Sequence, residues 1–196
     1  MNYKDRVFSL LDYEKVYSII NDKIILEVGS GNGVFLEYLS LKYPENIIFG
    51  IELDIKRAKK CLKRIIRNNL NNAYIVSGEV EEVLPLFFKD KVVEKTFLNF
   101  PEPWPKIHNW RNRVFEIEVM SYIDRVSKVG AEFYLSTDVS MVFDTVNMIF
   151  TQVLGNWEFG EDLTKEYIKN FVPTLYYEKW LSEGRKFWWG VWKKVY

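Results

Sequence analysis

Short runs of apolar residues alternate with longer amphipathic stretches along most of the chain. Five runs have the length and composition of buried strands, at 24–28, 47–51, 73–77, 95–100 and 131–137. Five stretches have the apolar spacing of helices, at 35–43, 56–68, 81–88, 114–127 and 141–154. This alternation predicts a parallel α/β sheet with helices on both faces.

The C-terminal part departs from the alternation. Two aromatic-rich segments, 157–160 and 185–194, predict a closing pair of antiparallel strands. We therefore expect a mostly parallel seven-stranded sheet with an antiparallel C-terminal strand. No repeat, low-complexity segment or linker divides the sequence, so we expect a single domain over residues 1–196.

Composition narrows the class of protein. Apolar residues make up 48% and charged residues 28%, which is typical of a globular domain that can bury a core. The one cysteine, Cys61, allows no internal disulfide and fits a reducing compartment. The sequence has neither a signal-peptide pattern nor an 18-residue apolar run, so we expect a cytoplasmic protein without a membrane span.

The charges are balanced overall but unevenly distributed. The formal net charge is zero, which gives no global argument for nucleic-acid binding. Residues 56–67, however, include seven basic residues and no acidic one, and 106–113 adds three more and the single histidine, His108. The distribution matters more than the sum, because a local basic surface can attract a polyanion.

A glycine-rich loop, EVGSGNG at 27–33, follows the first predicted strand and leads into the first helix. Gly29, Gly31 and Gly33 allow a tight turn and a close approach of the backbone to a ligand. Glu52 ends the second strand, where a carboxylate can accept both ribose hydroxyls of an adenosine. Enzymes that use NAD and enzymes that use S-adenosylmethionine (SAM) share this combination, and a plain strand-to-helix turn also explains the glycines.

The spacing of the loop favours SAM over NAD. The glycines follow G-x-G-x-G, and Glu27 lies two residues before the first of them. A pyrophosphate-binding loop prefers G-x-G-x-x-G, and a nearby carboxylate would repel the negatively charged pyrophosphate. SAM has no phosphate and carries a sulfonium and an amino group, which an acidic residue would complement. The loop together with Glu52 therefore predicts a SAM site.

A third acidic residue, Glu79, follows the third predicted strand. In such sheets this corner lies near the adenine ring, and a carboxylate there can accept the exocyclic amine. A glutamate favoured by the dipole at a helix N-terminus explains Glu79 equally without a ligand, and taken alone this is the simpler explanation.

A proline-rich segment, NFPEPWPKIHNWRNR at 99–113, follows the fourth predicted strand. Its three prolines hold the chain with little entropy to lose, and ligands of open α/β sheets bind beyond the carboxyl ends of the strands. We expect Trp104 to form a wall of the target pocket. The residues expected to face a polyanion are Lys106, Arg111 and Arg113. The alternative is a structural proline-rich turn with Trp104 in the core.

These motifs together resemble the bacterial tRNA (guanine-N7-)-methyltransferase family. The family's signature is similar to N-F-P-D-P-W-P-K, which stands here as NFPEPWPK at 99–106. Its cofactor loop is similar to E-[IV]-G-x-G-x-G followed by G-I-E, which stand here at 27–33 and 50–52. The resemblance extends from the glycine loop to TLYYEK at 174–179. It implies a Rossmann-like class I methyltransferase fold, SAM as cofactor, and methylation of a guanine (position 46) in the variable loop of tRNA. Separately from the resemblance, we expect no metal site and a monomer or homodimer.

The resemblance also assigns roles to individual residues. The positions that fall on the family's SAM-binding acids are Glu27, Glu52, Glu79 and Glu102. Those that fall on its substrate-binding positions are Lys106 and Asp138, and Thr174 begins its C-terminal substrate motif. Glu102 and Asp138 are accordingly the candidates for a catalytic role.

The sequence departs from the family pattern in three places. Glu79 and Glu102 replace the usual aspartates and are one methylene longer. The basic run is thinner, with KIHNWRNR in place of a pattern similar to KKRHHKRR. The C-terminal motif resembles T-x-[YF]-E-x-K followed by a glycine, and counting back from Gly184 places Tyr177 at the glutamate position and Glu178 one residue late. Either residue is a candidate for the substrate contact.

The chemistry of the implied reaction needs no general base. Guanine N7 is a lone-pair acceptor without a proton, so the enzyme mainly aligns it with the methyl group. Asp138 is our candidate for accepting the N1–H and N2–H donors of guanine and for stabilising the cationic purine that forms. The guanine must leave the tRNA stack, and Trp104, or less well His108, is the candidate that replaces the lost stacking.

Other functions remain open. NFPEPW loosely resembles the N-P-P-[YFW] motif of amino-methylating enzymes, in which Asn99-Phe100-Pro101 would orient an amine. A non-catalytic RNA- or protein-binding module with a degenerate methyltransferase fold fits the thin basic run and zero net charge, although the retained Glu27, Glu52, Lys106 and Asp138 argue against it. An NAD-dependent dehydrogenase has the least support, because no hydride-transfer site is visible.

Overall fold

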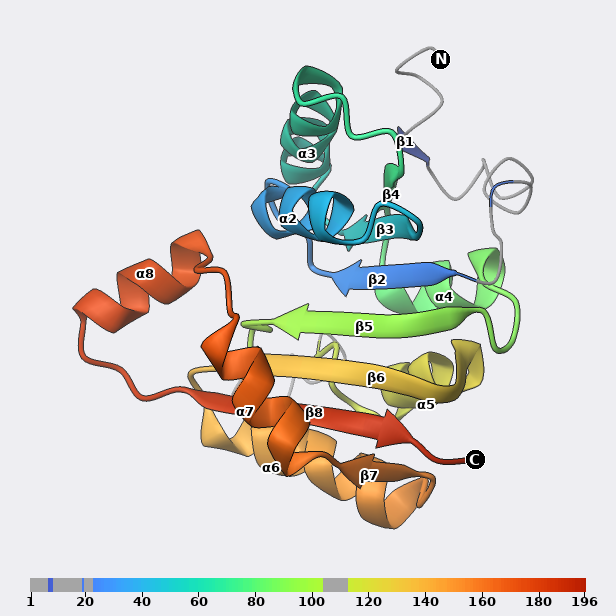
Figure 1. The fold of residues 1–196 in the computed structure, drawn as a ribbon, viewed down its shortest axis with the longest axis vertical. Coiled ribbons are helices and arrows are strands. Elements are labelled where there is room, and N and C mark those ends of the chain that lie inside the picture. The colour runs from blue at the N-terminus through green and yellow to red at the C-terminus, as the bar shows by residue number, and fades with distance from the viewer. Residues whose placement is uncertain (1–6, 9–18, 20–22, 104–112) are drawn as a thin grey trace.

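The computed structural model describes residues 7–8, 19, 23–103 and 113–196. Within these residues the strands form one eight-stranded sheet in the order β1-β4-β3-β2-β5-β6-β8-β7 (Figure 1). The strands are β1 (Val7–Phe8), β2 (Ile24–Val28), β3 (Ile47–Glu52), β4 (Ala73–Ser77), β5 (Val93–Asn99), β6 (Ser127–Thr137), β7 (Trp157–Phe159) and β8 (Trp188–Lys194).

The sheet confirms the predicted topology. Strands β1 to β6 pair in parallel, whereas β8 pairs antiparallel with both β6 and β7. All seven predicted strands are present. The eighth, β1, has two residues and lies at the edge beside β4, so it is too short to produce a periodic pattern in the sequence.

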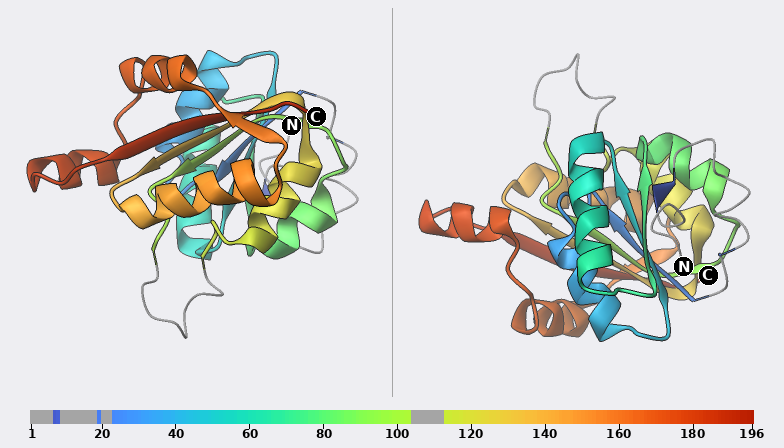
Figure 2. Two further views of the ribbon diagram at one scale, coloured as in Figure 1. Left: turned by 90° about the horizontal axis from the view of Figure 1, so that it is seen from below. Right: turned by 90° about the horizontal axis from the view of Figure 1, so that it is seen from above.

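Helices cover both faces of the sheet, as the alternating pattern predicts (Figure 2). The helices α2 (Val34–Lys42), α3 (Ile55–Arg67) and α7 (Glu161–Lys169) contribute buried side chains to the core on one face. The helices α4 (Val80–Phe87), α5 (Ile117–Val126) and α6 (Ser140–Met148), with the π-helical turn η4 (Ile149–Val153), do so on the other. Of the late aromatic residues, Trp157 and Trp192 belong to the core on this second face, where Trp192 is fully buried against Phe133 and Phe150.

The sequence patterns did not predict α7 and α8 (Leu175–Ser182). The helix α7 buries only Thr164 and Tyr167, so its apolar spacing is sparse. The helix α8 extends beyond the end of the sheet, at the left of Figure 1. Among the helices of the described residues, none has the length and apolar character to span a membrane.

The parallel strands direct five loops to one edge of the sheet. The chain crosses from one side of β2 to the other, because β3 pairs with β2 on one side and β5 on the other. Ligands of open α/β sheets bind at such a switch point, beyond the carboxyl ends of the strands. The ends of these strands and the segments that follow them contain the predicted cofactor acids, the glycine loop, the start of the proline-rich segment and Asp138. The C-terminal motif, 174–179, lies elsewhere in the chain, after α7.

Candidate functional site

The glycine loop after β2 adopts a conformation that glycine favours. Gly29, Gly31 and Gly33 have φ angles of +77°, +56° and +79°. Gly29 N–H and Ser30 N–H donate to the carbonyl of Ile51 at 2.9 and 3.1 Å, which fixes the loop against the end of β3. At Gly33 the packing is also tight, since an added Cβ would lie 2.5 Å from Cys61 Sγ on α3. The loop therefore brings backbone to the switch point without intervening side chains.

Glu52 at the end of β3 holds this loop in place. Its Oε2 accepts the N–H of Gly31 at 2.7 Å, and its Oε1 accepts the N–H of Asp54 at 2.9 Å. A carboxylate offers about four acceptor positions, so these two bonds leave capacity for hydroxyl donors such as those of a ribose. The expected ribose contact of Glu52 is compatible with this geometry, and Glu52 also has a structural role that the sequence did not indicate.

Glu27 at the end of β2 is buried without sufficient partners. Its side chain is 3% exposed, and Oε2 accepts no hydrogen bond from any residue that the structure describes. Burial, with a smaller contribution from neighbouring Glu52, raises the pKa of Glu27 to about 8. An ionised carboxylate that is buried beside a second acidic residue is unfavourable. A cationic ligand at the loop would relieve this cost.

The two other predicted cofactor acids lie at the same edge and are exposed. Glu79 is the N-cap residue of α4 but makes no side-chain cap hydrogen bond, so a glutamate favoured by the helix dipole still explains it without a ligand. Glu102 follows Pro101 at the start of the proline-rich segment. Each is positioned by a loop that follows a strand, as we expected for residues that contact a ligand.

The end of β5 is tied to its neighbours through Asn99. Its Oδ1 accepts hydrogen bonds from the hydroxyls of Ser136, at 2.7 Å, and Tyr167, at 2.9 Å. Both lone pairs of the amide oxygen are therefore used within the protein. Phe100, the next residue, has a φ of +51°, which is uncommon for a bulky side chain and turns the chain into the proline-rich segment.

Arg113 points into the protein rather than toward a polyanion. It is 8% exposed, its Nε donates to the carbonyl of Pro103 at 3.0 Å, and its Nη1 pairs with Glu116 at 3.1 Å. This arrangement suits an anchor that closes the proline-rich segment, and it argues against the phosphate contact expected for Arg113. The other predicted residues of the segment, Trp104, Lys106 and Arg111, lie outside the described residues.

Asp138 follows β6 at the same edge. Its side chain is 10% exposed, and its Oδ2 forms an ion pair with Nη1 of Arg185, which lies between α8 and β8. No sequence pattern indicated this partner, because 47 residues separate the two positions.

The C-terminal motif forms the first turn of α8. Thr174 caps the helix, and its hydroxyl accepts the N–H of Tyr177 at 3.2 Å. The ring of Tyr177 lies among aromatic rings, with its centroid 4.8 Å from that of Phe187 and 5.3 Å from that of Phe171. Glu178 is exposed. Of the two candidates in this motif, Glu178 is therefore the one that presents a carboxylate to solvent.

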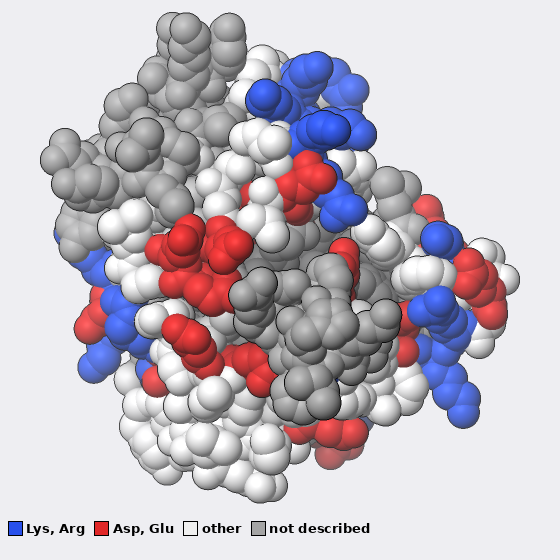
Figure 3. Space-filling view, turned by 180° about the vertical axis from the view of Figure 1, so that it is seen from behind, with Lys and Arg blue, Asp and Glu red and all other residues white. Residues whose placement is uncertain are grey.

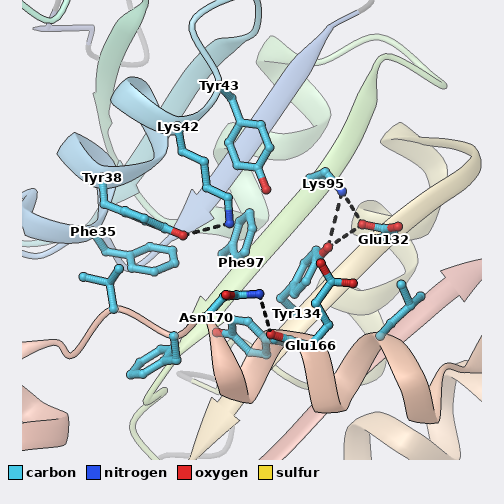
Figure 4. A pocket seen from close by; sticks show the side chains of 14 residues that line it. Phe35, Tyr38, Lys42, Tyr43, Lys95, Phe97, Glu132, Tyr134, Glu166 and Asn170 are labelled. Carbon is cyan, nitrogen blue, oxygen red and sulfur yellow. Dashed lines mark hydrogen bonds and ion pairs between the residues drawn. The ribbon is translucent and has the colours of Figure 1, made fainter.

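A cavity of about 230 Å³ lies away from this edge, between α2 and α7 (Figure 4). Its charged and hydroxyl groups are largely paired with one another. Lys95 and Tyr134 both bond to Glu132, and Lys42 donates to the Tyr38 hydroxyl at 2.8 Å. The cavity covers the middle of β5 and β6, so it is distinct from the site at the strand ends. Across the described ranges, no group of three or more His, Cys, Asp or Glu side chains is placed to hold a metal ion.

Comparisons with known proteins agree with the geometry. A family model described as putative methyltransferase matches residues 21–189. A tRNA (guanine-N(7)-)-methyltransferase of Thermotoga maritima is 31% identical over 180 residues, which cover 90% of this chain and 55% of that protein. A protein of the same name from Paracoccus denitrificans is 32% identical over 163 residues, which cover 82% of this chain and 67% of that protein. The chain thus spans about half to two thirds of the length of these curated relatives.

The fold has solved counterparts. A SAM-dependent methyltransferase from Aquifex aeolicus superposes with a TM-score of 0.58 at 15% identity, over 96% of this chain and 90% of that one. At this identity the similarity establishes the fold alone. The predicted Rossmann-like fold is confirmed.

The tight contact at Gly33 predicts unequal costs for two glycine substitutions. Gly31→Ala adds backbone strain alone, because nothing lies within 4 Å of the added Cβ. Gly33→Ala adds the same strain and an overlap with Cys61. We expect thermal melting to show a loss of about 2–4 °C for Gly31→Ala and at least about twice that for Gly33→Ala. Equal losses would mean that the Cys61 contact does not restrict the loop.

The raised pKa of Glu27 predicts a pH-dependent stability. The folded state binds a proton more tightly than the unfolded state, so the free energy of unfolding falls as pH rises from about 4.5 to about 8. We expect Glu27→Gln to remove this fall and to exceed the wild type at pH 8.5 by on the order of 5 kcal/mol. Urea unfolding at pH 5 and pH 8.5 measures both values.

Glu79→Gln is the matched control for Glu27→Gln, since it removes an exposed carboxylate from the same edge of the sheet. Its unfolding free energy is expected to follow the wild-type pH dependence. If the Glu27→Gln curve also runs parallel to the wild type, buried Glu27 does not carry the predicted cost.

Proposed function

The chain belongs to the family of the bacterial tRNA (guanine-N(7)-)-methyltransferases, and we propose that it transfers a methyl group from SAM to N7 of a guanine in tRNA. The observation that carries the proposal is the pair of buried acids, Glu27 and Glu52, beneath the glycine loop at the switch point. A pyrophosphate would meet two carboxylates there. A cofactor with a cationic centre and a ribose matches the same groups.

The residues present fit SAM. Glu27 offers a buried carboxyl oxygen, Oε2, which has no partner among the described residues and complements a positive charge. Glu52 keeps acceptor capacity for the ribose hydroxyls, and exposed Glu79 and Glu102 flank the same edge. When bound, SAM supplies an electrophilic methyl group. The glycine loop allows the backbone to approach it closely.

Asp138 is the residue that we propose recognises the guanine base. Guanine presents N1–H and N2–H donors, which a carboxylate can accept together, whereas adenine presents an acceptor at N1 and would be rejected. No side chain has to remove a proton, because N7 carries none. The Asp138 carboxylate would also stabilise the positive charge that develops on the purine. Glu178 and Thr174 lie on α8 as further candidates for the substrate contact.

The basic face of α3 supports a polyanionic substrate. Ala58, Cys61 and Ile65 face the core, and the remaining sides carry six exposed cations. They are Lys56, Arg57, Lys59, Lys60, Lys63 and Arg67. Figure 3 shows Lys and Arg side chains gathered over this helix. Because α3 begins directly after β3, this surface starts at the edge that holds the cofactor residues, and it can contact phosphates of a tRNA whose guanine enters the site.

The geometry weakens the main rival, an amine methyltransferase that uses Asn99. In that reaction the side-chain carbonyl of Asn99 would accept a hydrogen bond from the amine, but it already accepts two within the protein.

Position 46 in the variable loop, implied by the family resemblance, is the proposed target. A tRNA substrate and a single buried cysteine both suit a cytoplasmic location.

Incubation of the protein with SAM and an unmodified tRNA transcript, followed by nucleoside analysis, tests the function. We expect N7-methylguanosine in the tRNA. A transcript that stays unmethylated while calorimetry detects SAM binding would point to another substrate. Absence of both would indicate a non-catalytic module.

Substitution of Asp138 separates base recognition from cofactor binding. Asp138→Asn keeps the size of the side chain but cannot accept both guanine donors, so kcat/KM for tRNA should fall by about 10- to 100-fold. The Kd for SAM, measured by calorimetry, should stay within about twofold of the wild type. Asp144→Asn, at an exposed position on α6, is the matched control and should retain full activity. Equal loss of SAM affinity in Asp138→Asn would remove the base-reading role.

Charge removal on α3 tests the proposed RNA surface. The double variant Lys59→Gln/Lys63→Gln should weaken tRNA binding and reduce the salt dependence of log Kd by about one unit for each lost phosphate contact. Lys89→Gln/Lys91→Gln removes the same charge before β5, at the opposite edge of the sheet, and should leave the slope unchanged. Identical slopes for both double variants would exclude α3 from the tRNA interface.

A further inference from the structure

Arg185 lies between two groups that suit a guanine. Its guanidinium carbon is 3.4 Å from the ring centroid of Trp180, so the two planar groups are in contact. Its Nη1 forms the ion pair with Asp138. The backbone N–H of Arg185 donates to the carbonyl of Trp180 at 3.1 Å, which brings the residue back against α8 after the turn at Gly184. A planar group with N–H donors thus rests on an indole and faces a carboxylate.

The chemistry of a guanidinium matches the edge of guanine. In guanine, N1–H and the N2 amino group are attached to the same carbon, C2, and point in one direction as a pair of donors. Arginine presents the same arrangement of donors on a planar carbon centre. Both stack on aromatic rings, and N7 methylation makes the purine cationic, so the product resembles a guanidinium more closely than guanine does.

We propose that Arg185 is a built-in stand-in for the guanine, and that Trp180 and Asp138 form the guanine site that it covers in the ligand-free protein. This inference rests on the proposed function. A flipped guanine displaces the guanidinium, stacks on Trp180 and donates N1–H and N2–H to Asp138. Trp180 thereby takes the stacking role for which the sequence suggested Trp104.

The different exposure of the Asp138 and Arg185 side chains explains why Asp138 needs a partner in the empty site and why Arg185 can be displaced. The Asp138 side chain is 10% exposed, so its charge would be costly without a partner while the site is empty. The Arg185 side chain is 42% exposed and belongs to the segment between α8 and β8. An ion pair with one partner this accessible contributes little net stability, so exchange for a substrate is inexpensive. The guanidinium released from Asp138 moves into solvent at the edge where tRNA would lie.

The matched variants Arg185→Met and Lys186→Met test the displacement step. Each removes one exposed cation from neighbouring positions, but only Arg185 pairs with Asp138 within the described residues. Loss of an internal competitor should lower the KM for tRNA in Arg185→Met by about threefold to fivefold, without a lower kcat. Lys186→Met should leave KM unchanged or raise it. A raised KM or a reduced kcat in Arg185→Met would overturn the proposal, because Arg185 would then contact the tRNA or support Asp138 during the reaction.

Substitution of Trp180 tests the stacking surface. Trp180→Ala should raise the KM for tRNA by about tenfold or more, whereas Trp180→Phe keeps an aromatic face and should retain most of the affinity. Thermal melting establishes that both variants fold, and calorimetry establishes that both bind SAM. A KM for Trp180→Ala equal to that of the wild type would overturn the stacking role.

The wild-type product distinguishes failure of this inference from failure of the proposed function. If the wild type forms no N7-methylguanosine, the proposed function is rejected and the stand-in with it. If the wild type forms N7-methylguanosine but Arg185→Met has a raised KM, the function stands and only the stand-in is rejected.

Discussion

The site depends on two acids that the fold places under its glycine loop. Glu52 fixes the loop by accepting the N–H of Gly31 at 2.7 Å, and Glu27 lies beside it, buried and short of partners. Burial alone makes such a pair unfavourable, and the raised pKa of Glu27 expresses that cost. The arrangement becomes favourable once a cationic ligand arrives. The same constraint explains why this loop suits SAM and not a pyrophosphate.

Two arginines pair with groups at this edge. Arg113 closes the proline-rich segment through the carbonyl of Pro103, and Arg185 neutralises Asp138. Asn99 joins β5, β6 and α7 through the hydroxyls of Ser136 and Tyr167. Asp138 and the Asn99 carbonyl are therefore paired without a substrate, and in the proposed function Asp138 would exchange its partner for the guanine. The six exposed cations of α3 could attract phosphates without such an exchange.

The sequence predicted the fold well because periodic patterns report burial directly. Strands buried on both faces and amphipathic helices produced clear patterns, whereas β1 is too short and α7 and α8 bury too little to do so. The positions of Glu27, Glu52 and Asp138 at strand ends were predicted, because strands are recognisable from the sequence pattern. The site was not predicted where contacts link distant segments. The charge of Arg113 suggested an exposed side chain, and only the packing shows that it is buried. Arg185 and Trp180 belong to no sequence motif, and only their contacts in the structure link them to Asp138.

Proton release on SAM binding tests the central claim, that Glu27 is the buried counter-charge of the cofactor. Calorimetry at pH 7 in two buffers of different ionisation enthalpy measures it for the wild type and for Glu27→Gln. Because the pKa of Glu27 is about 8 without ligand, the acid is mostly protonated at pH 7 and must lose its proton to face a cation. The account predicts that the wild type releases close to one proton more than Glu27→Gln and binds SAM more tightly. Equal proton release and equal affinity in the two proteins would contradict it.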